Sequence, residues 1–221
     1  MFVYAGAVAS QLSLFDTGDE ARLGPLDCPV GRADLGDGAW LDVRRQWVGR
    51  HDLLFDRLMD TVTWRAESRR MYDRTVAVPR LVAFYDEGDE LPDALLAEAR
   101  ERLSLRYQDQ ACGPLRTVGL CLYRDGADSV AWHGDTIGRD SGGDTLVAIV
   151  SLGERRRFLL RPAGGGPSLR YELGAGDLLV MGGSCQRTWQ HAVPKSSRVP
   201  GPRMSIQFRS AQPSGSATVP T

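Results

Sequence analysis

The second half of the chain consists of short segments that alternate apolar and polar residues or are rich in β-branched residues, separated by Gly-rich stretches. Segments of this length and pattern predict β-strands joined by turns. Strands that follow one another this closely favour an antiparallel sandwich or barrel. The predicted strands are Thr117–Tyr123, Val130–Asp135, Leu146–Leu152, Arg157–Arg161, Ser168–Leu173, Asp177–Met181 and Arg203–Arg209.

Two segments ahead of these strands have helical character. Apolar residues recur at roughly helical spacing over Leu41–Val62, and Leu91–Ser104 opens with Pro92 and is rich in Leu, Ala, Glu and Arg. We therefore expect an α+β fold, with N-terminal helices followed by a double-sheet, jelly-roll barrel. Residues 1–35 are expected to form a poorly ordered arm, residues 36–211 the folded domain, and residues 212–221 a loose tail.

The composition is that of a globular chain, with 42% hydrophobic and 25% charged residues. No apolar run approaches the roughly 20 residues that a membrane helix needs, so we expect no membrane association. The first residues lack the basic and apolar regions of a secretory signal, which favours a cytoplasmic protein. The four cysteines form no CxxC pair, so neither a disulfide framework nor a zinc knuckle is indicated.

Positive charge is concentrated near the C-terminus. The net charge is −1, yet residues 151–210 contain ten Arg or Lys residues against three acidic ones. The whole chain therefore does not bind nucleic acid through bulk charge, but this region can provide a surface that faces phosphates. Alternatively, these basic residues lie on solvent-exposed strand faces and form ion pairs with acidic residues elsewhere in the chain.

Three residues could form a metal centre. His133 and Asp135 lie two apart on a predicted strand, so their side chains point to the same side. An HxD pair alone arises often by chance. The chain has only three histidines, and while His51 lies in a predicted helix, His191 lies in the same β-rich region. Two histidines and one carboxylate form the facial triad of non-haem Fe(II) oxygenases, which leaves metal positions open, unlike a structural zinc site.

The last predicted strand has a polar face. Alternation places Arg203, Ser205, Gln207 and Arg209 on one side and apolar residues on the other. Charged groups inside a small barrel need an anionic partner, and a guanidinium pairs with a carboxylate through two hydrogen bonds. A dicarboxylate co-substrate would fit. The alternative is an exposed edge strand whose arginines meet water.

These residues together resemble the signature of the AlkB family of Fe(II)/2-oxoglutarate dioxygenases, over roughly residues 70–210. The stretch Tyr123–Asp135 is similar to the family's segment from its co-substrate tyrosine to its metal pair, and the Arg-x-x-x-x-x-Arg spacing of Arg203 and Arg209 is particular to AlkB. The resemblance implies a double-stranded β-helix barrel preceded by a nucleotide-recognition segment. It also implies that Fe(II) binds to His133, Asp135 and His191, and that O2 is a co-substrate.

The resemblance further implies that Tyr123 and Arg203 bind the distal carboxylate of 2-oxoglutarate, with Arg209 near its metal-bound end. Ser205 and Cys121 belong to the same co-substrate site, but both stand where the family usually has Asn. These departures remove amide hydrogen bonds from the site. After Asp135 the chain continues with Thr136-Ile137, where relatives commonly carry an acidic residue near the target base. The base preference of the family can therefore not be assigned to this chain.

The implied activity is oxidative dealkylation, in which an alkyl group on a base nitrogen is hydroxylated and leaves as an aldehyde, formaldehyde for a methyl group. Such enzymes flip the base out of the helix and stack it on aromatic side chains. Val78–Tyr85 resembles the family's nucleotide-recognition segment, so Phe84 and Tyr85 are stacking candidates, unless either packs in the core. The other candidates for contact with the substrate are Trp132, Arg157 and Arg161.

The expected substrate is alkylated nucleic acid, most readily single-stranded DNA. Two alternatives stay open: a 2-oxoglutarate-dependent hydroxylase of a protein or small molecule, and a non-catalytic metal-containing barrel that only binds nucleic acid. In the N-terminal arm, Gln11-Leu12-Ser13-Leu14-Phe15 resembles the peptide by which bacterial polymerases and repair enzymes bind the sliding clamp. The same apolar residues could instead fold back onto their own domain.

Overall fold

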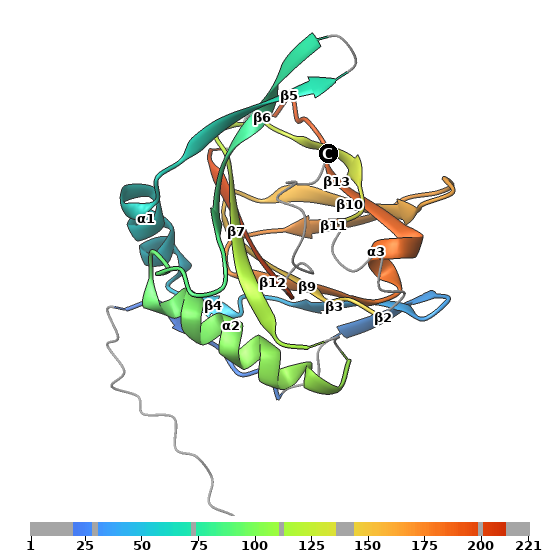
Figure 1. Ribbon diagram of the computed structural model, residues 1–221, viewed down its shortest axis with the longest axis horizontal. Helices are drawn as coiled ribbons and strands as arrows, with labels where there is room; N and C mark the ends of the chain where they lie inside the picture. The colour runs from blue at the N-terminus through green and yellow to red at the C-terminus, as the bar shows by residue number, and fades with distance from the viewer. Residues whose placement is uncertain are drawn as a thin grey trace, which may run out of the picture.

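The computed structural model describes residues 20–27, 31–71, 74–110, 113–135, 144–198 and 201–210. The fold is mostly β, with few helices, and the strand pairs among these residues are antiparallel (Figure 1). None of the described helices is long and apolar enough to span a membrane. The elements in chain order are β1 Arg22–Leu23, β2 Gly31–Gly36, β3 Ala39–Arg44, β4 Val48–Gly49, α1 His51–Thr61, β5 Arg65–Met71, β6 Arg74–Tyr85, α2 Ala94–Arg106, the 3-10 turn Gln108–Gln110, β7 Leu115–Tyr123, β8 Val130–His133, β9 Val147–Gly153, β10 Arg156–Pro162, β11 Leu169–Leu173, β12 Asp177–Gly183, α3 Cys185–Thr188, β13 Trp189–Val193 and β14 Arg203–Ser210.

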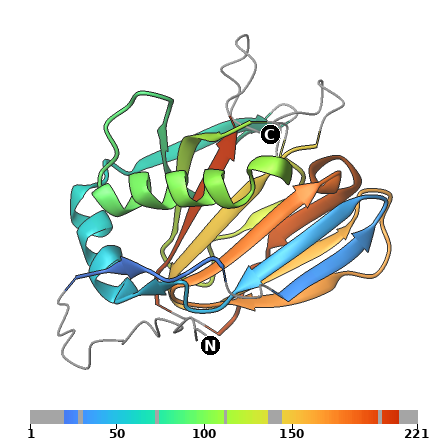
Figure 2. The ribbon, with the colours of Figure 1, turned by 90° about the horizontal axis from the view of Figure 1, so that it is seen from below.

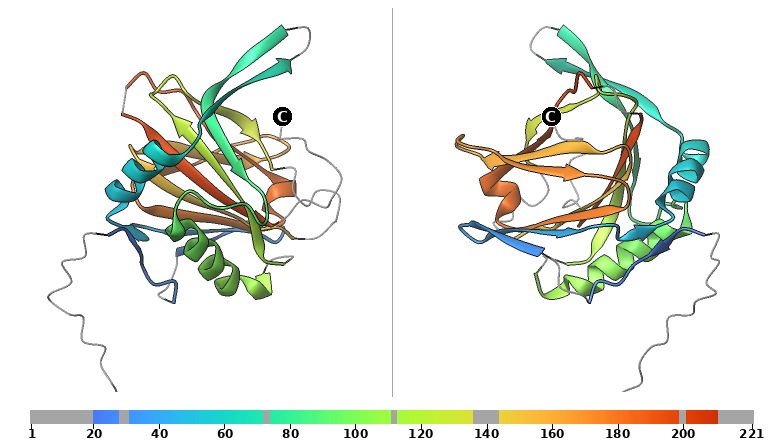
Figure 3. Two further views of the ribbon diagram at one scale, coloured as in Figure 1. Left: turned by 60° about the vertical axis from the view of Figure 1, so that its left-hand side comes forward. Right: turned by 180° about the vertical axis from the view of Figure 1, so that it is seen from behind.

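Two sheets face each other. The larger sheet has the strand order β2-β3-β12-β9-β14-β7-β6-β5, and the smaller one has the order β11-β10-β13-β8. Figure 3 shows the smaller sheet lying over one face of the larger. An apolar cluster fills part of the space between them, including Phe158 and Leu160 from β10 and Leu179 and Met181 from β12. This inter-sheet layer is where the polar face of β14 also points.

The helices α1 and α2 cover the other face of the larger sheet, as Figure 2 shows for α2. Asp93 caps α2 by accepting a hydrogen bond from the backbone N–H of Leu95, which satisfies one of the free amides at the helix start. Leu96, Ala99 and Leu103 recur at helical spacing and are buried against the sheet. The larger sheet is therefore covered on both faces.

Strand β14 lies between β9 and β7 in the middle of the larger sheet. Both of its faces are buried: Met204, Ile206 and Phe208 pack in the cluster beneath the helices, while Arg203 and Ser205 face the smaller sheet. The alternative of an exposed edge strand is therefore excluded. A charged side chain at Arg203 is instead enclosed by the protein.

The structure confirms the seven predicted strands, although β8 ends at His133, before Asp135. The helix predicted over Leu41–Val62 is wrong in its first half, because Ala39–Arg44 is strand β3, paired with β12. Ala39 and Leu41 alternate toward the inter-sheet layer, and sheet pairing outweighs the helical spacing of these few apolar residues. The second helix begins at Ala94, later than the predicted Leu91, since Asp93 is its cap.

The order of elements also differs from helices followed by strands. Strands β1 to β4 precede α1, and β1 and most of β2 lie within residues 1–35, for which a poorly ordered arm is expected. Strand β1 pairs with β4, and β2 pairs with β3 at the edge of the larger sheet. These short segments lack a strand-like sequence pattern, and pairing with β4 and β3 explains why they form strands. The peptide Gln11–Phe15 and residues 212–221 lie outside the described residues.

Candidate active site

His133 and His191 are direct partners on neighbouring strands of the smaller sheet. Their Cα atoms pair across β8 and β13, and their ring centroids lie 4.2 Å apart. Residues that pair across antiparallel strands point to the same face. His191 in turn pairs with Leu160 and stacks on Phe158, with ring centroids 5.4 Å apart, so both imidazoles face the inter-sheet layer.

Both imidazoles are in the neutral form. His133 Nδ1 lies 2.9 Å from the carbonyl oxygen of Ala131; since a carbonyl only accepts, Nδ1 carries the proton and Nε2 keeps its lone pair. Burial lowers the pKa of His133 and lowers that of His191 to about 3. Neutral imidazole is the form that binds metal ions.

Asp135 follows directly after β8 and is almost fully buried. Burial is the largest single influence and would raise the pKa of its carboxyl group, but the electrostatic effects of Arg209, His191 and His133 together outweigh it and lower the pKa to about 2. Arg209 Nη2 donates to Oδ1 over 3.2 Å, whereas Oδ2 is buried without a hydrogen-bond partner among the described residues. The backbone N–H of Asp135 donates to Gln186 Oε1, which fixes the chain at this point. Burial of an ionised oxygen without a partner is energetically unfavourable, and binding of a cation would relieve this cost.

Two neutral imidazoles and one carboxylate with an unpaired oxygen fit the donor set of a facial metal triad. Within the described residues, no three His, Cys, Asp or Glu side chains already stand in the arrangement of a metal site. The fit therefore rests on the chemistry of the donors and the unpaired oxygen of Asp135, which together can accommodate a divalent ion.

A second polar cluster lies farther along the same layer. Arg203 is fully buried, donates from Nε to Ser151 Oγ over 2.9 Å, and has its Nη1 unpartnered within the described structure. Its guanidinium carbon lies 5.1 Å from the ring centroid of Tyr123, its Cα partner on β7. Burial raises the pKa of Tyr123, which keeps the phenol neutral. An arginine with a free buried N–H is suited to an anion such as a carboxylate.

Gln207 connects the two positions where this chain lacks the expected Asn. Its Nε2 donates to Ser205 Oγ over 2.6 Å, and Cys121 Sγ lies 3.8 Å from its Oε1. The sequence places Gln207 on this face through the alternation with Arg203 and Ser205, yet it does not single out this residue. An amide is thus present beside Ser205 and Cys121, supplied from a different position.

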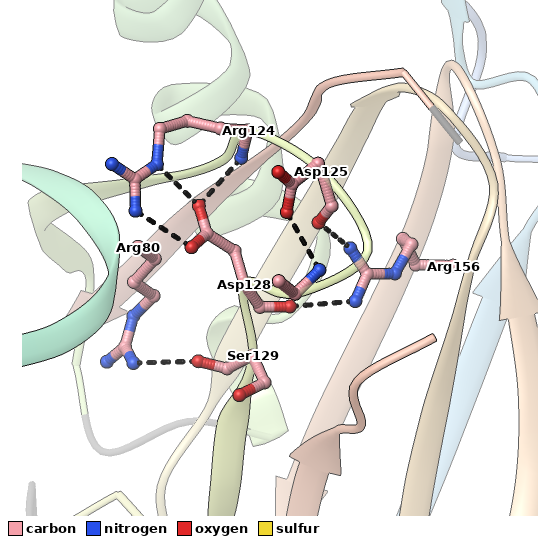
Figure 4. Close-up of polar contacts among 7 residues, drawn as sticks. Arg80, Arg124, Asp125, Asp128, Ser129 and Arg156 are labelled. Atoms are coloured by element: carbon pink, nitrogen blue, oxygen red, sulfur yellow. Dashed lines mark hydrogen bonds and ion pairs between the residues drawn. The ribbon is translucent and has the colours of Figure 1, made fainter. Parts of the chain in front are cut away.

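The turn between Tyr123 and β8 is held by a polar network (Figure 4). Arg124 and Asp128 pair through two hydrogen bonds of 2.8 and 2.9 Å. Buried Arg156 donates to the carbonyl oxygens of Asp125, Asp128 and Pro194, at 2.8, 2.8 and 2.9 Å. No sequence motif marks Arg156, because its partners are backbone carbonyls. Its guanidinium also lies 5.7 Å from the Tyr123 ring, so it fixes the surroundings of that side chain.

The two aromatic candidates on β6, Phe84 and Tyr85, lie in different environments. Phe84 pairs with Gly119 and is 54% exposed, whereas Tyr85 packs against the core beneath the helices. A Cβ atom at Gly119 would lie 3.0 Å from Arg209 Nη1 and 3.8 Å from Phe84 Cδ2. Phe84 therefore borders the site next to Arg209. Tyr85 instead packs against the core, which was the alternative to a stacking role.

The remaining candidates lie on the outer face of the smaller sheet. The Arg161 guanidinium stacks on the Trp132 ring at 4.3 Å and donates to Gln190 Oε1. Trp132 precedes His133 by one residue, so alternation points its side chain away from the metal candidates. Arg157 is largely exposed and lies 3.8 Å from Glu172. Thr136 and Ile137 lie outside the described residues.

Comparisons with known proteins show the family of the chain. Residues 85–209 match the model of the 2OG-Fe(II) oxygenase superfamily. The chain is 32% identical over 181 residues to the "alpha-ketoglutarate-dependent dioxygenase alkB homolog 3" of Bos taurus, covering 73% of this chain and 62% of the relative. It is 26% identical over 223 residues to the "DNA oxidative demethylase ALKBH2" of Arabidopsis thaliana, covering 80% and 68%. The chain thus spans about three fifths of the length of the alkB homolog 3 protein.

Proposed function

The chain belongs to the 2OG-Fe(II) oxygenase superfamily, among its AlkB-like members, and on this premise we propose that it removes alkyl groups from the bases of nucleic acid by oxidation. The proposed activity consumes 2-oxoglutarate and O2 and yields succinate, CO2 and an aldehyde, which is formaldehyde for a methyl group. The relatives named above are a dioxygenase and a DNA oxidative demethylase. The finer fold that we propose is the double-stranded β-helix, formed by the two facing sheets.

One observation carries the proposal. Asp135 is buried beside the paired imidazoles of His133 and His191, and its Oδ2 has no partner among the described residues. These three residues would hold Fe(II). The bound ion, together with 2-oxoglutarate and O2, supplies the oxidising power for hydroxylation of an alkyl carbon.

The chain's own residues prepare the site for this chemistry. Arg209 orients Asp135 through Oδ1, and Ala131 fixes the His133 ring so that Nε2 can face the ion. Arg203 and Tyr123 would bind the distal carboxylate of 2-oxoglutarate, with Ser151 holding the guanidinium in place. The burial of Arg203 excludes water from this pair, which strengthens the electrostatic attraction.

The substrate proposal rests on Phe84 in particular. An exposed aromatic ring beside Arg209 offers a stacking surface for a base that has left the helix, and such stacking tolerates different bases. Exposed Arg157 and half-buried Arg161 provide positive charge on the neighbouring sheet, where Arg161 stacks on the Trp132 ring. We propose single-stranded alkylated DNA as the preferred substrate, since an unpaired base costs the least energy to extrude.

The test is reconstitution of the protein with Fe(II) and 2-oxoglutarate without air, followed by exposure to O2. Single-stranded oligonucleotides carrying one 1-methyladenine or one 3-methylcytosine are supplied, and oligonucleotide mass and succinate are measured together. We expect loss of one methyl group for each succinate formed. The matched unmethylated oligonucleotide controls for uncoupled turnover.

Succinate without a change in oligonucleotide mass would contradict the substrate and favour a hydroxylase of a protein or small molecule. Oligonucleotide binding without any succinate would favour a non-catalytic binder. His133→Ala separates binding from chemistry: we expect it to abolish turnover while oligonucleotide binding remains.

Two further proposals concern where the protein works. We propose that it acts in the cytoplasm, and that Gln11–Phe15 binds the sliding clamp, with Leu12, Leu14 and Phe15 entering an apolar pocket. Titration of purified clamp with the protein tests the second proposal. A Leu14→Ala, Phe15→Ala variant is expected to lose binding, and unchanged affinity would exclude the clamp. We propose residues 36–211 as the catalytic domain; β1 and most of β2 lie before residue 36 and pair with its strands β4 and β3.

A further inference from the structure

An open hollow of about 200 Å³ lies where β10 begins and β11 ends, at one end of the smaller sheet. The chain segment that follows β13 forms its other side. None of the residues assigned above to iron or 2-oxoglutarate lines the hollow. Arg156, which supports the turn after Tyr123, is part of its lining. Its lining residues are Arg155, Arg156, Arg157, Arg170, Glu172, Pro194, Lys195, Ser196 and Arg198.

The lining is strongly positive, with six basic residues and one acidic residue. The carboxylate of Glu172 is already engaged by Arg157 and Arg170. The side chains of Arg155, Lys195 and Arg198 form no salt bridge with any residue that the structure describes, and all three are exposed. Like charges this close repel one another, so an anion in the hollow would relieve an unfavourable arrangement.

The hollow is also firmly constructed. Arg156 is buried in its floor and joins the turn at Asp125–Asp128 to Pro194 through backbone carbonyls. Ser196 donates its backbone N–H to the carbonyl oxygen of Gly126 over 2.7 Å. A Cβ atom at Gly126 would lie 2.3 Å from Ser196 O, so the two loops touch. The loop that carries Lys195 and Arg198 is therefore fixed against the body of the protein.

The position of the hollow relates it to the candidate active site. Leu160 on β10 is the Cα partner of His191, and Arg156 lies four residues earlier on the same strand. Four residues of extended strand cover about 13 Å. A strand of duplex DNA advances about 3.4 Å per nucleotide along its axis, and an extended single strand covers a greater distance per nucleotide. The hollow is thus at most about four nucleotides away from a base at the metal candidates.

From this geometry we propose that the hollow is a second binding site, which holds backbone phosphates of the substrate strand at most about four nucleotides from the flipped base. The proposal rests on the proposed function, since it assigns the phosphates to the same nucleic-acid strand. Exposed Lys and Arg side chains suit this role because phosphate contacts position a strand without reading its sequence. The site would make affinity depend on substrate length.

The experiment measures fluorescence anisotropy with two single-stranded DNAs, a 13-nucleotide strand with a central 3-methylcytosine and a trinucleotide with the same base in the middle. The pocket variant is Lys195→Gln, Arg198→Gln. The control variant is Arg102→Gln, Arg106→Gln, which removes two exposed charges from α2 on the far side of the larger sheet. A titration with inorganic phosphate tests whether the hollow holds a free anion instead.

We expect the pocket variant to bind the 13-nucleotide strand about tenfold more weakly at 0.1 M salt, and the slope of log affinity against log salt to fall by about 1.4, since each phosphate contact of a single strand contributes about 0.7. Trinucleotide affinity and demethylation of the trinucleotide should stay within twofold of the wild type. The control variant should match the wild type for both DNAs.

An unchanged salt slope and affinity for the 13-nucleotide strand would overturn the second site. An equal loss for the trinucleotide would also overturn it, by placing the charges at the base itself. Phosphate binding that the pocket variant loses, without any effect on the long strand, would show a free-anion site instead. Failure of the proposed function is distinguishable, because the wild-type protein would then remove no methyl group from either DNA.

Discussion

His133 and His191 face each other from adjacent strands, with ring centroids 4.2 Å apart, although 57 residues separate them in the chain. The pairing of β8 with β13 brings them together, and the buried carboxylate of Asp135 follows two residues after His133. The site is therefore a property of the sheet register. A one-residue slip of β13 would turn His191 to the outer face.

Arg203 is predicted to determine the affinity for 2-oxoglutarate. Arg203→Met removes charge-assisted hydrogen bonds, each of which contributes about 1.5–3 kcal/mol, so the KM for 2-oxoglutarate should rise about 10- to 100-fold. Arg203→Lys keeps the charge but loses the planar fork, and it should have a smaller effect. Succinate formation at varied 2-oxoglutarate measures both. A KM unchanged in Arg203→Met, with a normal unfolding transition, would contradict the assignment.

Gln207 is predicted to replace the missing Asn side chains at the co-substrate site. Gln207→Ala removes the hydrogen bonds to Ser205, each with a net contribution of about 0.5–1.5 kcal/mol, and should raise the KM for 2-oxoglutarate about 3- to 10-fold. Gln108→Ala, in the exposed turn after α2, serves as the matched control. If both variants behave alike, Gln207 has no part in co-substrate binding.

Phe84 is predicted to bind the target base. Phe84→Ala should weaken binding of an alkylated oligonucleotide about 5- to 100-fold, since stacking on one aromatic ring contributes about 1–3 kcal/mol. The KM for 2-oxoglutarate should not change. Tyr85→Phe keeps the ring that packs on the core and should bind like the wild type. Equal affinities of Phe84→Ala and the wild type would exclude stacking at this position.

The pair Arg124–Asp128 predicts a pH dependence of stability. The hydrogen bond from the Arg124 side chain, together with its backbone N–H, lowers the pKa of Asp128 in the folded protein below its usual range. A lowered folded-state pKa adds stability above the unfolded value of about 3.9, and this contribution is lost as the pH falls through the folded-state pKa. The half-exposed Arg124 limits the contribution to the order of 1 kcal/mol.

Urea unfolding of the wild type and Asp128→Asn checks this dependence. The difference in unfolding free energy between the two proteins should have its maximum value at pH 6 and should decrease below about pH 4. A difference that stays constant over this range would show that the Asp128 carboxylate does not contribute through its charge.

The sequence was sufficient for the strands whose alternation is strong and for residues whose types are rare. The three histidines of the chain and the alternation of Arg203–Arg209 led directly to the residues that the structure brings together. Strand β3 could not be predicted, because Ala39 and Leu41 become a strand only through pairing with β12, more than 130 residues later. Local spacing contains no information on that partner.

Residues that act through backbone groups were also beyond prediction. Arg156 binds three carbonyl oxygens, and carbonyls carry no sequence signal. The separation of Phe84 from Tyr85 required the pairing with Gly119 and Val118, which decides which ring faces the site. For Gln207, the alternation with Arg203 was visible, but the contact with Ser205 depends on side-chain conformation.

The central claim is that His133, Asp135 and His191 hold one iron ion, and the most direct measurement is equilibrium binding of Fe(II) in the absence of air. The wild type should bind one equivalent, and His191→Ala should bind at least about 100-fold more weakly, since loss of a direct ligand exceeds the 10- to 100-fold effect of an outer partner. His51→Ala, which changes the third histidine at the start of α1, should bind like the wild type. One equivalent bound by His191→Ala with wild-type affinity would contradict the account.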